Sequence, residues 1–235
     1  MPSILALDTS TDVCSVALLH DGQVYESVSH TAREHTQRLL PMIEALLADH
    51  QVTLKNLDAI AFGRGPGSFT GLRICLSVAQ GLAYGADLPL IGVSSLLAMS
   101  RQAQRLERLA PGTCVIPIID ARMDEVYWSA YRCDEQQGLI HLAEEQVATP
   151  EQSCDDILQL QAETICAVGS GWHYPVLQAL PNVKLHPDIY PSAYDMAEIA
   201  VESFERKDFL SPLEAQPHYL RNEINWKKRQ RIRET

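Results

Sequence analysis

The first half of the chain alternates short apolar runs with polar turns. The run from Ile4 to Leu7 ends at Asp8, and an Asp21-Gly22 turn separates the next two runs. Short runs joined by tight turns predict three antiparallel strands, and apolar residues at helical spacing follow them. The elements expected in this half are strands at 4–8, 13–19 and 23–29, a helix at 33–49, a strand at 57–62, a helix at 70–84 and a strand at 88–93.

The same order of elements recurs in the second half. An apolar run at 114–119 ends at Asp120, 112 residues after Asp8, and Thr149 can cap a helix that starts at Pro150. The elements expected here are strands at 114–119, 125–132 and 139–147, the helix from Pro150, a strand at 164–168 and a helical segment after the turn Gly169-Ser170-Gly171. Three antiparallel strands, a helix and a parallel strand, present twice, resemble the ribonuclease H-like fold in its duplicated, actin-like form.

This resemblance implies an α/β protein with two ribonuclease H-like domains in tandem, as in the actin-like ATPase superfamily, with mixed sheets flanked by helices. We expect the first domain at residues 1–108 and a smaller second domain at 109–190. Residues 191–235 are expected to form a C-terminal helix that packs back toward the first domain, followed by a basic tail. In the duplicated fold, the two first-strand aspartates face each other across a cleft and help to bind a metal-bound nucleotide phosphate.

Composition narrows the class of protein. With 235 residues, 46% of them hydrophobic, and a net charge of −11, the chain is expected to be globular rather than disordered or fibrous. No run approaches the ~20 apolar residues that span a bilayer, and the first residues lack a basic leader, so we expect a cytoplasmic protein without membrane contact. Six cysteines without a Cys-x-x-Cys pair indicate buried, reduced thiols rather than a zinc or redox site.

Positive charge gathers near the C-terminus. Five basic residues there carry +5, which leaves −16 for the rest of a chain whose net charge is −11. A body this acidic does not attract a nucleic-acid backbone by itself. The basic residues can form a local patch that contacts RNA phosphate, or they can simply be a solvated chain end. They are Lys227, Lys228, Arg229, Arg231 and Arg233.

The segment from Gly63 to Arg73 places four glycines and a proline between a strand and a helix. Glycine lets another backbone or a ligand come close. Ser68 or Thr70 can cap the helix, and a helix N-terminus favours an anion. No Gly-Lys-Ser/Thr follows, so the loop is not a Walker A loop. A structural turn and an anion site are both open at this point.

The helices expected at 33–49 and 70–84 carry more apolar surface than one sheet contact needs. Their apolar positions cover arcs of about 160° and about 200°, against a stripe of roughly 100° for a surface helix. Either the helices are fully buried in the monomer or their second side meets a partner chain, and we favour the partner interface. The residues expected in this interface are Leu39, Met42, Ile43, Leu46, Phe69, Thr70, Leu72, Arg73, Leu76 and Gln80.

Four segments carry a family resemblance. Asp8-Thr9-Ser10, the loop at 63–73, the segment 92–96 (Gly-Val-Ser-Ser-Leu) and Tyr219-Leu220-Arg221 resemble the bacterial TsaB family, also called YeaZ, over essentially the whole chain. The resemblance implies a subunit of the machinery that forms threonylcarbamoyladenosine (t6A) at N6 of adenosine 37 in tRNAs reading codons that begin with A. It implies two protein partners, the metal-holding catalytic paralogue TsaD and the ATPase TsaE.

The resemblance also implies how these components assemble. The chain forms a heterodimer with TsaD, or a homodimer when TsaD is absent, and it reaches tRNA through the complex. It binds no cofactor alone, and any ATP or ADP is held by the assembled complex.

Two segments argue against catalysis by this chain. Where TsaD carries two histidines four residues apart on a helix, this chain has Ser95 and Met99, which are poor ligands for such a metal. Asp120 is followed by Ala121 to Asp124 rather than by glycines, so side chains and the Asp124 charge would obstruct a phosphate. We therefore expect no catalytic residue and no metal site. The relic nucleotide cleft is expected to consist of Asp8, Thr9, Ser10, Asp120, Gly169 and Gly171.

Two functional hypotheses follow. In the first, the chain is a non-catalytic scaffold that pairs with TsaD through the two apolar helices and orders the partner's active site. In the second, it is an independent actin-like ATPase or hydrolase, including a glycoprotease-type peptidase. The second hypothesis requires Asp8 and Asp120 to face the cleft as a carboxylate pair.

Overall fold

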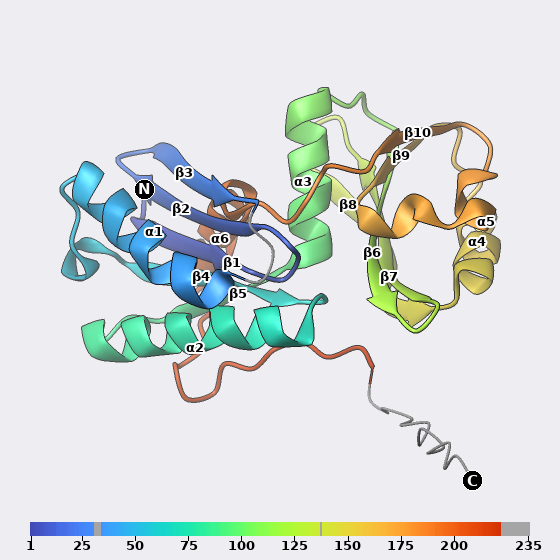
Figure 1. Ribbon diagram of the computed structural model, residues 1–235. Helices are drawn as coiled ribbons and strands as arrows, with labels where there is room; N and C mark the ends of the chain where they lie inside the picture. The colour runs from blue at the N-terminus through green and yellow to red at the C-terminus, as the bar shows by residue number, and fades with distance from the viewer. Residues whose placement is uncertain (31–33, 137, 222–235) are drawn as a thin grey trace, which may run out of the picture.

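Two five-stranded sheets lie side by side in the computed structural model, which describes residues 1–30, 34–136 and 138–221 (Figure 1). The strand orders are β3-β2-β1-β4-β5 and β10-β9-β6-β7-β8. The strands of the first sheet are β1 (Ile4–Asp8), β2 (Cys14–His20), β3 (Gln23–Ser29), β4 (Ala59–Gly65) and β5 (Leu90–Ser94). The strands of the second sheet are β6 (Cys114–Arg122), β7 (Glu125–Cys133), β8 (Leu139–Ala148), β9 (Ile165–Val168) and β10 (Val183–His186).

Helices cover both sheets. The α-helices in the described part of the chain are α1 (His35–Asp49), α2 (Phe69–Ala86), α3 (Ser95–Glu107), α4 (Pro150–Gln159), α5 (Pro175–Gln178) and α6 (Ala193–Glu205). Short 3-10 turns occur at Leu54–Asn56 and Ser170–His173. None of the helices in the described ranges combines the length and the apolar character needed to cross a bilayer.

Both sheets are built on one plan. β1 pairs antiparallel with β2 and parallel with β4, while β6 pairs antiparallel with β7 and parallel with β9. The order β3-β2-β1-β4-β5 therefore corresponds to β8-β7-β6-β9-β10. This repetition confirms the predicted fold class, an α/β protein made of two mixed, helix-flanked sheets of the ribonuclease H-like type.

The central strand β1 is buried on both faces. Leu5 and Leu7 belong to the core under α1 and α2, while Ile4 and Ala6 belong to the core under α6, on the opposite face (Figure 1). A strand with both faces covered reads as an uninterrupted apolar run rather than an alternating one. Because side chains alternate along a strand, Asp8 falls on the α6 side of the sheet.

The second sheet has its own core, and α3 lies between the two sheets (Figure 1). Trp128 and Trp172 are fully buried in this core, and the Trp172 indole N–H donates to the Ile116 carbonyl oxygen at 3.1 Å. On the other face of the sheet, Leu96 and Met99 of α3 pack with apolar residues of β6 and β9. α3 is therefore the helix through which the two halves share a core.

A bidentate ion pair joins α3 to α6. Arg105 Nε lies 3.0 Å from Asp195 Oδ1, and Arg105 Nη2 lies 2.7 Å from Oδ2. The Asp195 side chain has no exposed surface, and its burial raises the pKa of the carboxyl, which the Arg105 guanidinium opposes. Removing one partner of a buried pair costs about 3–5 kcal/mol, because the other charge is left unpaired. The pair fixes α6, a late segment of the chain, beside the first sheet.

All six cysteines are buried free thiols, as predicted. Burial raises the pKa of Cys14 and Cys114 to about 11 and that of Cys166 to about 12. The reactive thiolate form is scarcely populated at such pKa values. These side chains act as small apolar fillers of the core.

Candidate functional site

The first aspartate of the expected cleft, Asp8, is fully buried at the end of β1. Its Oδ1 atom accepts hydrogen bonds from the Ser10 backbone N–H at 3.0 Å and from the Ser10 hydroxyl at 2.9 Å. Its Oδ2 atom has no hydrogen-bond partner in the described part of the chain and lies against Gly63. Burial raises the pKa of Asp8 from 3.8 to about 7, and the Ser10 hydrogen bonds offset part of the rise. The expectation that Asp8 faces the cleft is therefore wrong.

The glycine-rich loop packs directly on the residues that follow β1. A Cβ atom at Gly67 would lie 2.4 Å from the Ser10 carbonyl oxygen, and one at Gly71 would lie 1.9 Å from the Thr9 carbonyl oxygen. The Thr9 hydroxyl donates to the Gly71 carbonyl oxygen, and the Ser68 N–H donates to the Ser10 carbonyl oxygen, both at 2.7 Å. Ser68 also caps α2, as predicted, by accepting from the Gly71 N–H. These contacts favour the structural turn over the anion site.

The second aspartate, Asp120, lies in a different environment on β6. Its side chain is 21% exposed and forms an ion pair with Arg122 at 3.3 Å. It also accepts a hydrogen bond from the Arg122 backbone N–H at 2.9 Å. The Asp120 backbone N–H donates to the Ser170 hydroxyl. The Asp120 charge is thus balanced within its own hairpin.

A hollow of about 450 Å³ lies between Asp120 and the N-terminus of α2. Arg122 lines this hollow, whereas Asp124 does not, and the expected obstruction by the Asp124 charge stays a prediction. Of the six residues expected in the cleft, Ser10 and Asp120 line the hollow, and Asp8, Thr9, Gly169 and Gly171 do not. The hollow therefore holds one carboxylate of the expected pair.

The two glycines after β9 serve the packing of the second sheet. A Cβ atom at Gly169 would lie 2.3 Å from the Met99 methyl carbon and 2.6 Å from the Ile118 carbonyl oxygen. One at Gly171 would lie 2.4 Å from the Ile118 side chain. Gly169 lets this turn approach β6 and α3, and Gly171 lets it approach β6. Their expected place in a nucleotide cleft stays a prediction, although Ser170 between them lines the hollow.

Ser95 and Met99, the two positions where the resemblance implies metal ligands in the catalytic paralogue, are interior. The Ser95 hydroxyl donates to the Ser10 hydroxyl at 3.1 Å, and Met99 is 1% exposed. Within residues 1–30, 34–136 and 138–221, no group of three or more His, Cys, Asp or Glu side chains could hold a metal ion. The residues present do not fit the metal of the paralogue.

Half of the residues expected at a partner interface are buried inside the monomer. They are at most 8% exposed and belong to the core that α1 and α2 form with the first sheet. These five side chains face the core of their own monomer, so the wide apolar arcs are explained in part by burial within the chain. The buried residues are Leu39, Ile43, Leu46, Leu72 and Leu76.

The exposed part of the expected interface lies at the N-terminal end of α2. Phe69 is 49% exposed, and Thr70 and Arg73 are also exposed. A hollow of about 460 Å³, lined by these residues and by Thr36 of α1 and Ser77, opens here. Met42 is half-buried, on α1.

An extended C-terminal segment, residues 209–221, runs along α2 (Figure 1). Leu210 forms an isolated antiparallel bridge with β5. The Gln80 side-chain amide donates to the carbonyl oxygens of Pro212 at 2.7 Å and Ala215 at 3.2 Å. Gln80 is therefore engaged by its own chain, and its contact with a partner stays a prediction.

The same segment then crosses to the second sheet. His218 Nδ1 lies 3.1 Å from Glu145 Oε2 on β8, and Arg64 of β4 lies 3.5 Å from the same oxygen. Arg221 pairs with Glu125 at the start of β7. Sequence reasoning missed these contacts, because they join residues at least 73 positions apart and no local pattern marks them.

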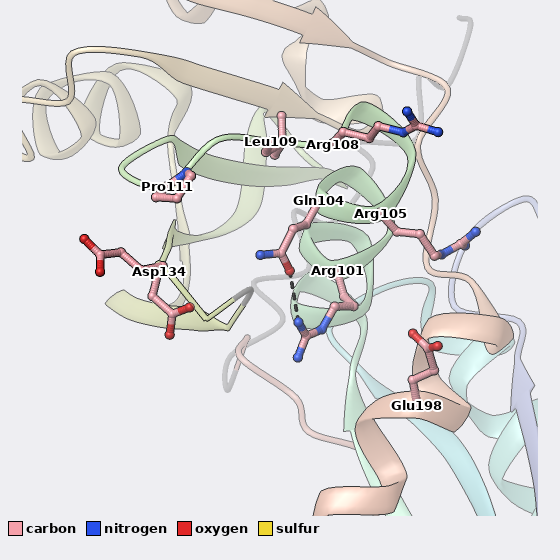
Figure 2. A pocket seen from close by; sticks show the side chains of 9 residues that line it. Arg101, Gln104, Arg105, Arg108, Leu109, Pro111, Asp134 and Glu198 are labelled. Carbon is pink, nitrogen blue, oxygen red and sulfur yellow. Dashed lines mark hydrogen bonds between the residues drawn. The ribbon is translucent and has the colours of Figure 1, made fainter. Parts of the chain in front are cut away.

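A further hollow, of about 640 Å³, lies beside α3 (Figure 2). Its lining includes three arginines and three acidic residues: Arg101, Arg105, Arg108, Asp134, Glu135 and Glu198. Arg105 is paired with Asp195, and Arg101 donates to Gln104 at 3.0 Å. Because its charges balance, this hollow favours neither an anion nor a cation.

The expected RNA-contacting residues are Lys227, Lys228, Arg229, Arg231 and Arg233. They lie outside the described residues. Their contact with RNA stays a prediction.

A family model described as "TsaD: tRNA N6-adenosine threonylcarbamoyltransferase" matches residues 28–178. The match runs from the end of β3 beyond the start of α5 and so includes parts of both sheets.

Relatives align over almost the whole chain. The "tRNA threonylcarbamoyladenosine biosynthesis protein TsaB" of Escherichia coli strain K12 is 44% identical over 229 residues, which are 96% of this chain and 97% of the relative. The protein of the same name from Haemophilus influenzae is 42% identical and covers 96% of both chains. The structure of YeaZ from Pseudomonas aeruginosa is 38% identical, with a TM-score of 0.81 over 94% of this chain and 100% of that one. A second P. aeruginosa structure, described as an uncharacterized protein with similarity to peptidase YEAZ, has a TM-score of 0.83.

Proposed function

Because the chain belongs to the TsaB family, also called YeaZ, we propose that it acts in tRNA threonylcarbamoyladenosine biosynthesis as a non-catalytic subunit. The observation behind this assignment is that two proteins named for this pathway are 44% and 42% identical in sequence over almost the whole chain. In this proposal the chain pairs with TsaD, works with the ATPase TsaE and forms a homodimer when TsaD is absent. It reaches tRNA through the complex, in the cytoplasm, and any ATP or ADP is held by the assembled complex.

The environments of the two aspartates support the non-catalytic role. A catalytic carboxylate must reach a water molecule or a phosphate group. Asp8 has no exposed surface, and the carboxylate of Asp120 is balanced by Arg122. Ser95 and Met99 stand where the catalytic paralogue carries metal ligands, and both are interior. These features are consistent with a chain that keeps the fold of its paralogue without the groups that the reaction needs.

The same features count against the second hypothesis, an independent ATPase or hydrolase. That hypothesis requires Asp8 and Asp120 to act together across the cleft. For Asp8 to reach the cleft, its contacts with Ser10 and Gly63 would have to open, and these contacts lie within the core of the first sheet. No observation on the described residues favours this alternative.

The N-terminal end of α2 supports a partner surface that is smaller than the one expected from sequence. Phe69, Thr70 and Arg73 are exposed there, and Leu40 on α1 is 43% exposed. A specific interface needs an apolar centre and a polar rim. The hollow between α1 and α2 offers such a centre, because Phe69, Ile74 and Val78 line it together with Thr70 and Ser77.

Nucleoside analysis tests the pathway. We expect depletion of this chain to remove t6A from cellular tRNA, and we expect the wild-type chain and its Asp120→Asn variant to restore it. Unchanged t6A after depletion would contradict the assignment to this pathway. Co-purification of TsaD with the tagged chain tests the partner, and light scattering of the chain alone tests the homodimer.

The non-catalytic role has a separate test. We expect the purified chain to show no ATP turnover above that of a heat-denatured sample. Turnover by the chain alone that the Asp8→Asn variant abolishes would overturn the non-catalytic role while leaving the pathway intact.

A further inference from the structure

The Arg73 guanidinium is fixed on the surface of α2 by two aromatic side chains. Its Cζ atom lies 3.8 Å from the centroid of the Phe69 ring, and its Nε–H donates to the Tyr219 hydroxyl at 3.1 Å. The Phe69 and Tyr219 rings are themselves in contact, with centroids 5.4 Å apart. An arginine side chain held in this way loses less rotamer entropy when it forms a further contact.

Arg73 nevertheless has no carboxylate partner in the described part of the chain. Other arginines of this chain are paired, for example Arg64 with Glu145 and Arg105 with Asp195. Arg108 and Arg132 also lack an ion pair in the described part of the chain, but of these three arginines Arg73 is the one that is stacked on an aromatic ring there. Within residues 1–30, 34–136 and 138–221, the Nη donors of Arg73 have no hydrogen-bond acceptor. The two Nη groups of Arg73 therefore form a planar pair of hydrogen-bond donors that is held in place and exposed to solvent.

Arg73 and Phe69 also separate two hollows. On one side is the hollow of about 460 Å³ against α1. On the other side is a hollow of about 700 Å³, whose walls include Leu72, Tyr127 and Leu220. A fixed charge between two partly apolar hollows is the arrangement of an interface hot spot, in which apolar contacts exclude water from a central polar pair.

We propose that Arg73 is the anchor for a carboxylate of the partner protein, and that apolar side chains of that partner fill the hollows on either side. The inference deepens the proposed function and rests on it, because that function supplies a protein partner at this end of α2. Charge complementarity identifies the occupant: the guanidinium fork matches a carboxylate with two parallel hydrogen bonds. An RNA phosphate would match the fork too, but the net charge of −11 disfavours an RNA strand against this body.

The surface is composite, because Tyr219 comes from the C-terminal segment and Arg73 from α2. Tyr219 is a positioning residue: its hydroxyl accepts from Nε and so directs the Nη edge outward. The C-terminal segment thereby takes part in the partner surface although it lies 146 residues from Arg73 in the sequence.

Titration calorimetry of the full chain with purified TsaD tests the proposal. We expect Arg73→Glu to weaken binding by ~100-fold or more, and Arg73→Lys by ~10-fold, because a lysine keeps the charge but lacks the fork. Tyr219→Phe removes the hydrogen-bond acceptor but keeps the ring, so it should weaken TsaD binding by several-fold. It should also reduce the difference in affinity between chains with arginine and with lysine at position 73.

The matched control is Arg132→Glu. Arg132 is an exposed arginine of β7 without an ion pair in the described residues, so its replacement should leave the affinity for TsaD within about two-fold.

Rescue identifies the occupant directly. One Asp→Lys or Glu→Lys change on the surface of TsaD should restore binding to the Arg73→Glu chain. Wild-type affinity of the folded Arg73→Glu chain would overturn the proposal. A loss of self-association or of tRNA binding with TsaD binding unchanged would also overturn it, in favour of a second copy or an RNA phosphate. If the wild-type chain itself does not bind TsaD, the proposed function fails rather than the role of Arg73 alone.

Discussion

The backbone of Gly63 closes off the unpartnered oxygen of Asp8. A Cβ atom at position 63 would lie 1.9 Å from Asp8 Oδ2 and 3.1 Å from its Cγ atom. The two residues stand on β1 and β4, which are neighbours in the first sheet, so the pairing of these strands holds the Gly63 backbone against the Asp8 carboxyl group. The buried position of the Asp8 carboxyl group therefore requires glycine at position 63.

This contact predicts the effect of a methyl group at position 63. Gly63→Ala should lower the free energy of unfolding by about 1–3 kcal/mol, because the new Cβ overpacks the core. Urea unfolding measures the change. The control is Gly81→Ala on α2, where a Cβ meets no atom within 4 Å, and alanine should raise stability by up to ~1 kcal/mol. Equal stability of wild type and Gly63→Ala would mean that Asp8 can leave its position at little cost.

Asp8 also predicts a pH dependence of stability. Its pKa is raised from 3.8 to about 7 in the fold, so the native state holds a proton that the unfolded state releases between these pH values. The stability that the neutral carboxyl contributes is full below about pH 4 and is lost as the pH rises to 7, by up to ~4 kcal/mol. Asp8→Asn, which cannot ionise, should therefore be more stable than wild type at pH 8 and lose this advantage at pH 4.

Denaturant unfolding of both proteins from pH 4 to pH 8 measures this difference. Comparing the two proteins removes the contribution of other titrating groups, such as Asp195. A stability difference that stays constant across this range would contradict the raised pKa of Asp8.

Leu76 and Ser77 are adjacent on α2, but the first is buried and the second is exposed. Leu76 is 8% exposed and belongs to the core, so Leu76→Glu should unfold the monomer, which a thermal melt detects. Ser77 is exposed and lines the hollow against α1, so Ser77→Arg should melt like wild type but fail to co-purify with TsaD. Normal co-purification of TsaD with Ser77→Arg would place the partner elsewhere.

The basic residues beyond position 221 give a prediction about RNA. Replacing Lys227, Lys228, Arg229, Arg231 and Arg233 with glutamine should weaken tRNA binding by the assembled complex. It should also reduce the slope of log K against log salt, by ~0.7–0.9 for each phosphate that the tail no longer neutralises. Filter binding at several salt concentrations measures both quantities. Unchanged affinity and slope would mean that these residues are a solvated chain end.

Local signals predicted most of the first sheet and the meander of the second. The turn at Asp21-Gly22 and the caps Ser68 and Thr149 lie where the sequence placed them, because caps and tight turns depend on a few adjacent residues. β10 was not predicted, since Val183–His186 is a short edge strand with exposed side chains and gives no apolar run.

The site was harder to predict than the fold. Asp8 was expected in the cleft from its place after an apolar run, but it is buried against Gly63, which lies 55 positions later on the neighbouring strand β4. The apolar arcs of α1 and α2 have the same periodicity whether the second side of a helix meets another helix or another protein. Periodicity could therefore not separate Leu72, in the core, from Phe69, on the surface.

The position of α6 has a consequence for the order of folding. Met196 and Ala200 of α6 cover Ile4 and Ile91 of the first sheet, yet the entire second sheet, residues 114–186, is synthesised before α6. The part of this sheet face that α6 covers therefore stays bare in a growing chain until residue 205 has emerged, whereas the strands of the second sheet find their partners within a contiguous stretch. We expect the half that is made second to complete its core first. A fragment that stops at residue 108 would expose that bare face and aggregate.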